Sequence, residues 1–350
     1  MVRRVAFAVP GDLETPTGGY AYDRRMIAEL RRLGWRIDLI DLGDGFPHPA
    51  PPQREAAQAQ LMAIPAGCPI VIDGLAFGVL PETAVRLCSD HPLIALVHHP
   101  LALETGLSAA QARDLRASER AALAAAKRVV VTSAATARLL AADYDVPADR
   151  IVVARPGNDP VPAGHRSTDG IVRLLAVGAV VPRKGFDVLI EALALLAELP
   201  WQLTIAGDRS RDPAAAARLD DDIARHKLGD RVAVLGAVPQ RRIAELYAGA
   251  DAFVLASRFE GYGMAFSEAI AHGLPVVGTT AGAIPDTVPP DAGILVAPGD
   301  AAALAAALRR LIESPAERHR MAASACAAAL ALPSWQDSAK HFACALEAAI

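Results

Sequence analysis

The sequence predicts an α/β protein with two doubly wound domains, each a parallel sheet covered by helices on both faces. Short, almost wholly apolar strands alternate with helical stretches along the chain, which is typical of such sheets. The 350 residues are too many for one ordinary core and suit two domains. Apolar residues make up 53% of the chain but aromatic residues only 5%, so small side chains allow helices to pack closely on a sheet.

The first half of the chain begins with the strand Val5–Val9, followed by a helix over Tyr22–Leu33 that Gly34 ends. Residues 43–52, rich in Gly and Pro, form a loop before the helix Glu55–Ala63. The remaining strands expected here are Arg36–Ile40, Ile70–Ile72, Leu93–Val97, Val129–Val131 and Ile151–Val153.

A stretch rich in Pro, Gly and polar residues, residues 156–170, predicts a linker because it has no apolar periodicity. The alternation restarts after it, so we assign residues 1–165 to one domain and residues 166–333 to a second. Residues 334–350 form an amphipathic helix that either packs on the second domain or crosses back to the first. The second set of strands is Arg173–Val177, Gln202–Ala206, Val232–Leu235, Ala252–Leu255, Pro275–Gly278 and Gly293–Val296.

Charge and composition argue against several classes of protein. Acidic and basic residues are interspersed with a formal net charge of −4, which gives no reason to expect a nucleic-acid partner. No apolar run reaches the ~18 residues that span a bilayer, and the N-terminal run stops at Pro10. We interpret arginine pairs such as Arg24-Arg25 as solvated helix faces rather than a membrane-binding surface. The cysteines lack zinc-like spacing and are expected to be free thiols in a cytoplasmic protein: Cys68, Cys88, Cys326 and Cys344.

The first motif with chemical meaning is VGAVVPRKG, residues 177–185, where a strand ends and a helix begins. Gly178 lets a ligand approach the backbone closely. Arg183 and Lys184 stand just before the helix Phe186–Leu196, whose N-terminus adds a positive dipole. Arg can hold phosphate oxygens in a fork and Lys supplies a point charge, so this turn predicts an anion site. A solvated basic turn is the alternative interpretation.

The second motif, SRFEGYGMAFSEAIAHG, contains two glutamates, Glu260 and Glu268, eight residues apart. Gly261 and Gly263 argue against one continuous helix. We therefore place Glu260 in a Gly-rich loop and Glu268 in a helix that starts near Met264. Glycine amides and the helix N-terminus would then face a pyrophosphate, with one carboxylate for each polar end of a sugar nucleotide. Alternatively, both glutamates are surface charges.

Together with LTIAGD, RVAVLGAVPQRRIAELYAGADAFVLAS, GLPVVGTTAGAIPDTV and AGILVAPGD, these motifs resemble the retaining glycosyltransferases of family 4, or glycosyl transferases group 1. The resemblance is dense over residues 171–312 and looser over residues 1–165. It implies a GT-B fold, in which two Rossmann-like domains face each other across a cleft. It also implies a hexosyltransferase that uses a UDP- or GDP-linked nucleotide sugar, a glycan, lipid or small-metabolite acceptor, no metal and no cofactor.

The resemblance assigns roles to residues of the second domain. It implies that Arg183 and Lys184 bind the donor diphosphate and that Glu268 holds the ribose. It implies that Glu260 binds the transferred sugar together with the amides of Gly261, Gly263, Met264 and Ala265. The other donor-binding residues that it implies are Gly18, Gly19, Gly178 and Val238, the last of these near the base.

The resemblance extends to two places in the first domain. Gly18 and Gly19 follow the first strand, where the family's loop flanks the donor phosphates and the acceptor. His98 also follows a strand and resembles the family's active-site histidine, although His99 is adjacent and the assignment between the two stays open. Catalysis is therefore expected from His98, Arg183, Lys184 and Glu260.

The chain departs from the family at residues 155–159, RPGND, where members often carry a Pro-Asn-Gly-Val-Asp-like sequence. No DxD stands at a strand end to hold a metal–diphosphate, and residues 220–222, DDD, fall on a solvated face of a predicted helix. The basic turn must then stabilise the leaving diphosphate without a metal. We expect front-face attack assisted by the leaving phosphate.

Three other functions share parts of this pattern. A dinucleotide-dependent oxidoreductase needs G-x-G-x-x-G after the first strand, but here Gly18-Gly19 follow Gly11 at the wrong spacing. A GT-B relative of other chemistry, such as a sugar-nucleotide epimerase or a phosphorylase, stays open. A non-catalytic sugar-nucleotide-binding protein also stays open, although it would not need the intact set Arg183, Lys184, Glu260 and Glu268.

Overall fold

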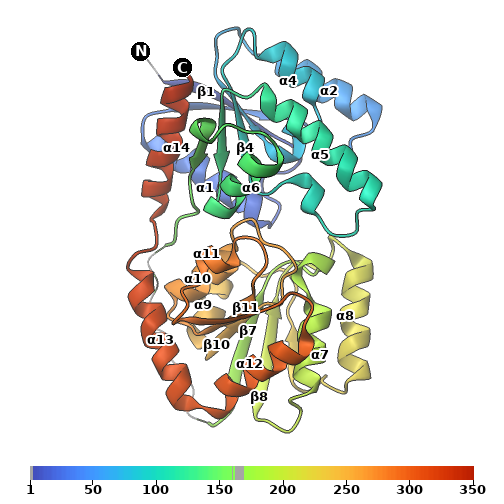
Figure 1. The fold of residues 1–350 in the computed structure, drawn as a ribbon, viewed down its shortest axis with the longest axis vertical. Coiled ribbons are helices and arrows are strands. Elements are labelled where there is room, and N and C mark those ends of the chain that lie inside the picture. Colours follow the sequence, from blue (N-terminus) through green and yellow to red (C-terminus); the bar gives the residue numbers. More distant parts are fainter. Residues whose placement is uncertain (1–2, 160, 162–168) are drawn as a thin grey trace. The chain divides into compact units, whose positions relative to one another are not determined.

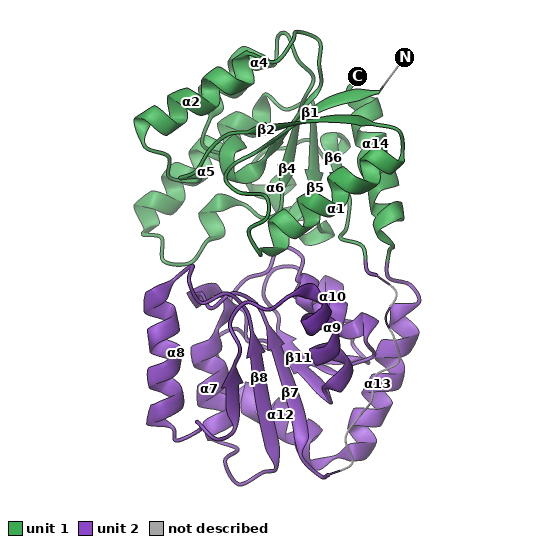
Figure 2. Cartoon of the chain, turned by 180° about the vertical axis from the view of Figure 1, so that it is seen from behind, with its two compact units in different colours: residues 1–157, 333–350 green, residues 158–332 purple. Residues whose placement is uncertain are grey.

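The computed structural model describes residues 3–159, 161 and 169–350, so the predicted boundary between residues 165 and 166 lies outside the described residues. The chain forms two compact units, drawn in Figure 1 and coloured separately in Figure 2. Unit 1 comprises residues 1–157 and 333–350, and unit 2 comprises residues 158–332. Each unit contains one six-stranded sheet whose neighbouring strands run parallel, which confirms the predicted doubly wound α/β class.

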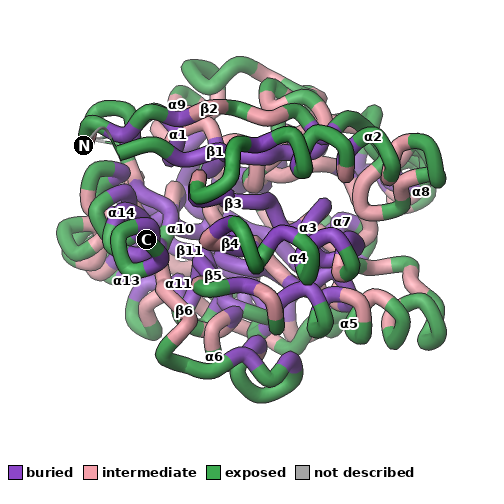
Figure 3. The backbone as a smooth tube through the Cα atoms, turned by 90° about the horizontal axis from the view of Figure 1, so that it is seen from above, coloured by how far each residue is buried: buried purple, intermediate pink, exposed green. Residues whose placement is uncertain are grey.

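The sheet of unit 1 has the strand order β2-β1-β3-β4-β5-β6. The order reverses at β1, because β2 is added on one side of it and the later strands on the other. Figure 3 shows the central strands of this sheet as buried backbone among exposed helix surfaces. The strands are β1 (Arg4–Val9), β2 (Arg36–Asp41), β3 (Ile70–Asp73), β4 (Leu93–Val97), β5 (Arg128–Val131) and β6 (Ile151–Val153).

Helices connect the strands of unit 1, as the alternating pattern predicts. The first begins at Gly18 because the side chain of Thr17 caps it, accepting a hydrogen bond of 3.1 Å from the amide of Tyr20. The helices are α1 (Gly18–Arg32), α2 (Pro51–Met62), α3 (Gly74–Phe77), α4 (Pro81–Leu87), α5 (Ala109–Ala124), α6 (Ala134–Asp143) and α14 (Trp335–Ala349), with the 3₁₀ turns η1 (Leu101–Leu103) and η2 (Ala148–Arg150).

The last helix, α14, belongs to unit 1 although it follows unit 2 in the sequence. It packs along α1 and against β4, β5 and β6. Phe342 stacks on Phe7 of β1 with ring centroids 6.2 Å apart, and Trp335 lies against Tyr22 of α1. Of the two packings that the sequence leaves open for this helix, the structure shows the one on the first unit.

The sheet of unit 2 has the order β12-β11-β10-β7-β8-β9, so its order reverses between β7 and β10. The strands are β7 (Val172–Val177), β8 (Trp201–Ala206), β9 (Val232–Val234), β10 (Ala252–Val254), β11 (Val276–Thr279) and β12 (Gly293–Val296). The helices are α7 (Phe186–Ala194), α8 (Pro213–Arg225), α9 (Gln240–Gly249), α10 (Met264–Ala271), α11 (Ile284–Thr287), α12 (Ala301–Glu313) and α13 (Pro315–Ala329), with the 3₁₀ turn η3 (Pro182–Lys184).

Doubly wound sheets bind ligands beyond the carboxyl ends of the strands where the order reverses. In unit 2, the segments that follow β7 and β10 there are residues 178–185 and 255–263. Both motifs singled out from the sequence therefore meet at the reversal point of one sheet. Among the described residues, no helix has both the length and the apolar character needed to cross a membrane.

Candidate functional site

The turn after β7 brings two cations to the reversal point of unit 2. Arg183 and Lys184 lie in η3. Gly185, the N-cap of α7, has φ of +65°, a left-handed conformation that suits glycine. A Cβ on Gly185 would also overlap the carbonyl oxygen of Ala256, so only glycine lets the turn lie against the segment that follows β10. The side chains of Arg183 and Lys184 are mostly buried.

Glu260 receives both cations. Lys184 Nζ lies 2.6 Å from Glu260 Oε1, and Arg183 lies 3.4 Å from Oε2. The hydroxyl of Ser257 donates a third bond to Oε1 at 2.6 Å. Burial alone would raise the pKa of Glu260, but the charges of Lys184 and Arg183 outweigh it and lower the pKa, so this buried carboxyl is ionised.

The backbone around Glu260 is held in place by the segment after β11. The amide of Ala283 donates to the carbonyl of Glu260 at 2.9 Å, and a Cβ on Gly282 would overlap that carbonyl oxygen. Gly261 follows in the buried loop, and Gly263 has φ of +88° at the N-cap of α10, where no described side chain accepts from the first turn. The amides at this helix start can therefore face a ligand.

Glu268 lies in the second turn of α10 and is partly exposed. Burial raises the pKa of Glu268 to about 7. The nearby hydroxyl of Tyr247, which donates to the carbonyl of Ala265 at 3.0 Å, and the charge of Lys184 partly offset this effect, whereas the charge of Asp159 adds to it. Glu268 is thus close to the point at which small changes in pH alter its charge.

The other predicted donor-binding residues occupy loops and helix starts. Met264 and Ala265 form the partly exposed first turn of α10, and Val238 is a partly exposed residue of the loop between β9 and α9. Gly178 follows β7 directly, and the side chain of Lys184 lies against it. In unit 1, Gly18 and Gly19 open α1.

The two adjacent histidines after β4 have different surroundings. His98 Nε2 lies 3.2 Å from Asp23 Oδ1 and 3.3 Å from Asp73 Oδ2, and Gly19 lies against the same edge of the ring. His99 Nε2 lies 3.3 Å from a carboxylate oxygen of Glu104. Within the described ranges, Asp23, Asp73 and His98 form the one group of three or more His, Cys, Asp or Glu side chains close enough to share a metal ion.

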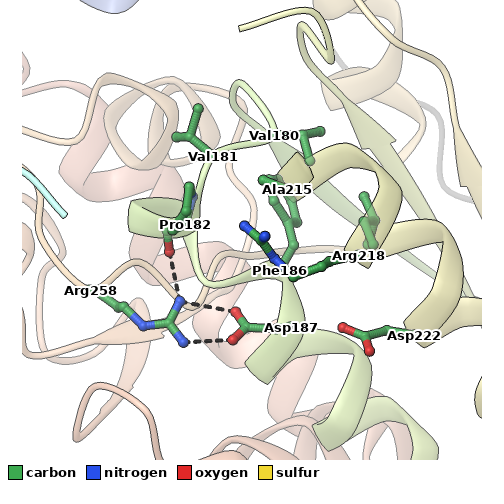
Figure 4. Close-up of a pocket in the computed structure, with 10 residues that line it drawn as sticks. Val180, Val181, Pro182, Phe186, Asp187, Ala215, Arg218, Asp222 and Arg258 are labelled. Atoms are coloured by element: carbon green, nitrogen blue, oxygen red, sulfur yellow. Dashed lines mark hydrogen bonds and ion pairs between the residues drawn. The ribbon is translucent and has the colours of Figure 1, made fainter. Parts of the chain in front are cut away.

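Sequence reasoning missed Arg258, which joins the two halves of the unit 2 site. Its guanidinium donates to Asp187 of α7 at 2.9 and 2.7 Å and to the carbonyl of Pro182 at 2.6 Å, as Figure 4 shows beside a surface pocket. Its backbone amide donates to the carbonyl of Arg183 at 2.7 Å. One residue thus fixes the basic turn to the loop that carries Glu260.

Sequence reasoning also missed Asp23, Asp73, Ser257 and Tyr247. Their partners are distant in the chain or depend on loop geometry, so hydrophobic periodicity gives no sign of them. Asp73 alone carried a signal, since it is an acidic residue directly after a buried strand.

Comparisons with known proteins identify the family of this chain. The model of Glycosyltransferase Family 4 matches residues 73–161, and that of Glycosyl transferases group 1 matches residues 163–327. The MMP alpha-(1->4)-mannosyltransferase of Mycolicibacterium hassiacum is 30% identical over 275 residues, which are 74% of this chain and 66% of that protein. The alignments span 39% to 66% of the lengths of the first three curated relatives.

Solved glycosyltransferase structures share the fold over nearly the whole chain. Sucrose-phosphate synthase of Thermosynechococcus elongatus has a TM-score of 0.80 at 22% identity, covering 97% of this chain and 98% of that one. Anabaena HepE in complex with UDP-glucose has a TM-score of 0.73 at 19% identity, covering 98% and 99%. These likenesses confirm the predicted fold.

Proposed function

Because the chain belongs to the glycosyl transferases group 1, the family 4 glycosyltransferases of GT-B fold, we propose that it moves a hexosyl group from a nucleotide sugar to an acceptor hydroxyl. The observation that carries the proposal is the cluster of Arg183, Lys184 and Glu260 at the reversal point of unit 2, beside the N-terminus of α10. Two cations and helix amides suit a diphosphate, and a fixed carboxylate suits sugar hydroxyls.

In this proposal Arg183 and Lys184 bind the donor diphosphate. Their present contacts with Glu260 hold them in place, so little side-chain entropy remains to be lost on binding. Glu260 and the amides of Gly261 to Ala265 bind the transferred sugar, and Glu268 accepts the ribose hydroxyls. Gly178 and Val238 flank the phosphates and the base, and Gly18, Gly19 and His98 supply the first unit's contribution.

We propose that the transfer retains the anomeric configuration and needs neither a metal nor a cofactor. The acceptor oxygen would approach the face that the diphosphate leaves, and the leaving phosphate would take its proton. Arg183, Lys184 and the dipole of α10 then stabilise the charge that develops on the leaving group. Each is already fixed by the fold, so no reorganisation is needed when the bond breaks.

The donor base and the setting of the reaction are also proposals. The likeness to HepE solved with UDP-glucose supports a UDP-linked donor ahead of a GDP-linked one. We propose a cytoplasmic enzyme, because Cys68, Cys88, Cys326 and Cys344 are free thiols, which suit a reducing compartment. The acceptor is a glycan, a lipid or a small metabolite.

The proposal is tested by thermal unfolding with UDP, GDP, ADP, NAD or NADP, on the wild-type protein and on Lys184→Ala. A ligand at about a hundred times its Kd adds about 2.7 kcal/mol to the folded state. A shift with UDP or GDP that Lys184→Ala loses is expected. A shift with NAD or NADP alone would contradict the proposal, and nucleotide binding without product from any acceptor would favour a non-catalytic binding protein.

The affinity for the nucleoside diphosphate is expected to rise as the pH passes through about 7, because ionised Glu268 accepts from the ribose hydroxyls with both oxygens and more strongly than the protonated acid does. Tyr247→Phe removes a neighbouring hydroxyl that lowers the pKa of Glu268, so it should move this rise to higher pH. Calorimetric titrations over a pH series measure it. Glu268→Gln is the control, since it keeps the ionisation of the phosphate itself; an unchanged pH dependence in this variant would refute the role of Glu268.

Arg258→Met is expected to weaken nucleoside diphosphate binding about tenfold, because the basic turn loses its connection to the Glu260 loop; this corresponds to about 1.4 kcal/mol. Binding of the nucleoside alone should change little, since only the phosphate contacts depend on the turn. Arg225→Met is the matched control, because Arg225 forms an exposed ion pair with Asp222 on α8. Equal losses of affinity for the nucleoside and for the nucleoside diphosphate would argue against this role of Arg258.

A further inference from the structure

Two carboxylates converge on one ring nitrogen in unit 1. Asp23 comes from α1, Asp73 ends β3, and His98 follows β4. Asp23 and Asp73 are 0% and 1% exposed, whereas the His98 side chain is 18% exposed. Both oxygens lie within 3.3 Å of the same atom, Nε2 of His98. The three side chains therefore form a buried cluster. The resemblance of His98 to the family's active-site histidine does not account for the two aspartates beside it.

The charges of this cluster need a cation. Asp73 Oδ1 accepts from the amide of Leu75 at 2.8 Å, but Asp23 Oδ2 has no hydrogen-bond partner among the described residues. Neither carboxylate has another described cation at ion-pair distance. Buried carboxylates are costly unless a positive charge pairs with them, and the ring of His98 is the group placed to supply it.

The geometry also decides which form of the ring fits. If Nε2 carried a lone pair, that lone pair would face two carboxylate oxygens and repel both. A proton on Nε2 removes the repulsion, and a second proton on Nδ1 gives the ring the charge that the carboxylates require. A proton at Nε2 accounts for both short distances without a further group.

The remaining neighbours of the ring add no opposing charge. Tyr22 meets it edge to face at 5.4 Å between ring centroids, and its hydroxyl donates to the carbonyl of Ala154. Burial raises the pKa of Tyr22 well above its usual value, so it stays neutral. Thr132 donates to the carbonyl of His98, and Gly19 adds only backbone.

The pKa values agree with this arrangement. Burial alone would lower the pKa of His98, but the charges and hydrogen bonds of Asp23 and Asp73 outweigh it and raise the pKa to about 10. Burial raises the pKa of Asp23 to about 6, although the charge of His98 opposes this. Near neutral pH the ring is therefore charged and Asp23 is mostly ionised.

We propose that Asp23 and Asp73 are positioning residues that hold His98 as an imidazolium throughout the neutral range. The ring is then a fixed cation and hydrogen-bond donor at the end of β4, and it cannot act as a general base. Its charge state follows from unit 1 alone; its use in sugar transfer rests on the proposed function. In that reaction, the ring would donate to a sugar hydroxyl or phosphate oxygen, and the acceptor proton would have to go elsewhere.

The test is ¹⁵N NMR of the histidine rings in the ligand-free protein over about pH 6 to about pH 8, where ordinary histidines titrate. His98→Gln identifies the signal among the nine histidines. We expect both ring nitrogens of His98 to stay in the imidazolium range over this interval. Titration of the His98 ring near its usual pKa, or a neutral tautomer of the ring, would overturn the proposal. The proposed transferase function would not be affected by this result.

Asp23→Asn then tests the cause. It removes one carboxylate and should bring the titration of His98 down into the measured interval. Glu104→Gln is the matched control, because it removes the carboxylate beside His99 and should leave the His98 signal unchanged. If Asp23→Asn leaves the titration of the His98 ring unchanged, the role proposed for Asp23 is overturned. Reversible broadening of the wild-type signal by Mn²⁺ would place a metal where we place a proton, and would overturn the proposal as a whole.

Discussion

Lys184→Met should lower kcat by about 10²–10³, because a preorganised charge is removed from the leaving diphosphate. Arg183 then remains as the second cation of the turn, and it lies farther from Glu260, at 3.4 Å, than Lys184 does at 2.6 Å. The measurement is release of the nucleoside diphosphate from nucleotide sugars that carry the base identified by thermal unfolding. Lys340→Met is the control, since Lys340 forms an exposed pair with Asp337 on α14. A rise in KM alone, with kcat unchanged, would contradict a role in the transition state.

Lys184→Met should also lower the stability of unit 2, and a double variant separates this effect from the loss of activity. Removing Lys184 leaves the buried carboxylate of Glu260 with a weaker partner, so unit 2 should lose about 3 kcal/mol of unfolding free energy. The double variant Lys184→Met, Glu260→Gln removes the buried charge as well and should regain most of that stability but none of the activity. Urea unfolding read from Trp201, with the other two tryptophans replaced, reports unit 2 alone. A double variant as unstable as Lys184→Met would refute this account.

The second large effect is expected at Glu119 on α5, which is 1% exposed. Its Oε2 accepts from the amide of Leu101 at 3.0 Å, and its Oε1 has no hydrogen-bond partner among the described residues. Burial raises the pKa of Glu119 from 4.5 to about 8, although the hydrogen bond from the amide of Leu101 opposes this. Between pH 4.5 and about pH 8, Glu119 therefore keeps its proton in the folded protein but loses it in the unfolded chain.

A group with a raised acidic pKa makes the folded state less stable as the pH rises between its unfolded and folded values. The loss approaches about 1.4 kcal/mol per pH unit. Glu119→Gln should remove this part of the pH dependence and stabilise unit 1 most at about pH 8 and above.

Urea unfolding at several pH values, in a Trp201→Phe background, follows Trp35 and Trp335 of unit 1. The difference between the variant and the wild type isolates Glu119 from Asp23, whose pKa is also raised. Glu82→Gln on the exposed side of α4 is the control. If the difference in unfolding free energy between Glu119→Gln and the wild type does not change with pH, Glu119 is ionised in the folded protein.

Local pattern was enough to predict the sheets and the loops that meet at the reversal point of unit 2. Strands such as β4 and β6 have the predicted bounds because their residues are continuous apolar runs between polar turns. The loop position of Glu260 followed from Gly261 and Gly263, since glycine seldom continues a helix. The start of α10 at Met264 followed from the same two residues.

Contacts between distant residues could not be predicted in this way. Asp23 is 75 residues from His98, and its position in α1 is that of any buried helix residue until the fold places it beside β4. Arg258 is 71 residues from Asp187, and an arginine in a loop gives no sign of its partner. Only the assembled sheet brings such pairs together, so the cluster around His98 and the Arg258 contacts required the structure.

The return of α14 to unit 1 sets an order of folding during synthesis. Unit 2 is continuous in sequence and has all its residues once Leu332 has left the ribosome. Most of unit 1 precedes unit 2 in the sequence, but Phe7 and Tyr22 lack the partners Phe342 and Trp335 until the residues after unit 2 have been synthesised. Until α14 is synthesised, the part of unit 1 that α14 covers is therefore an exposed apolar surface, of the kind that makes a partly folded chain prone to aggregate.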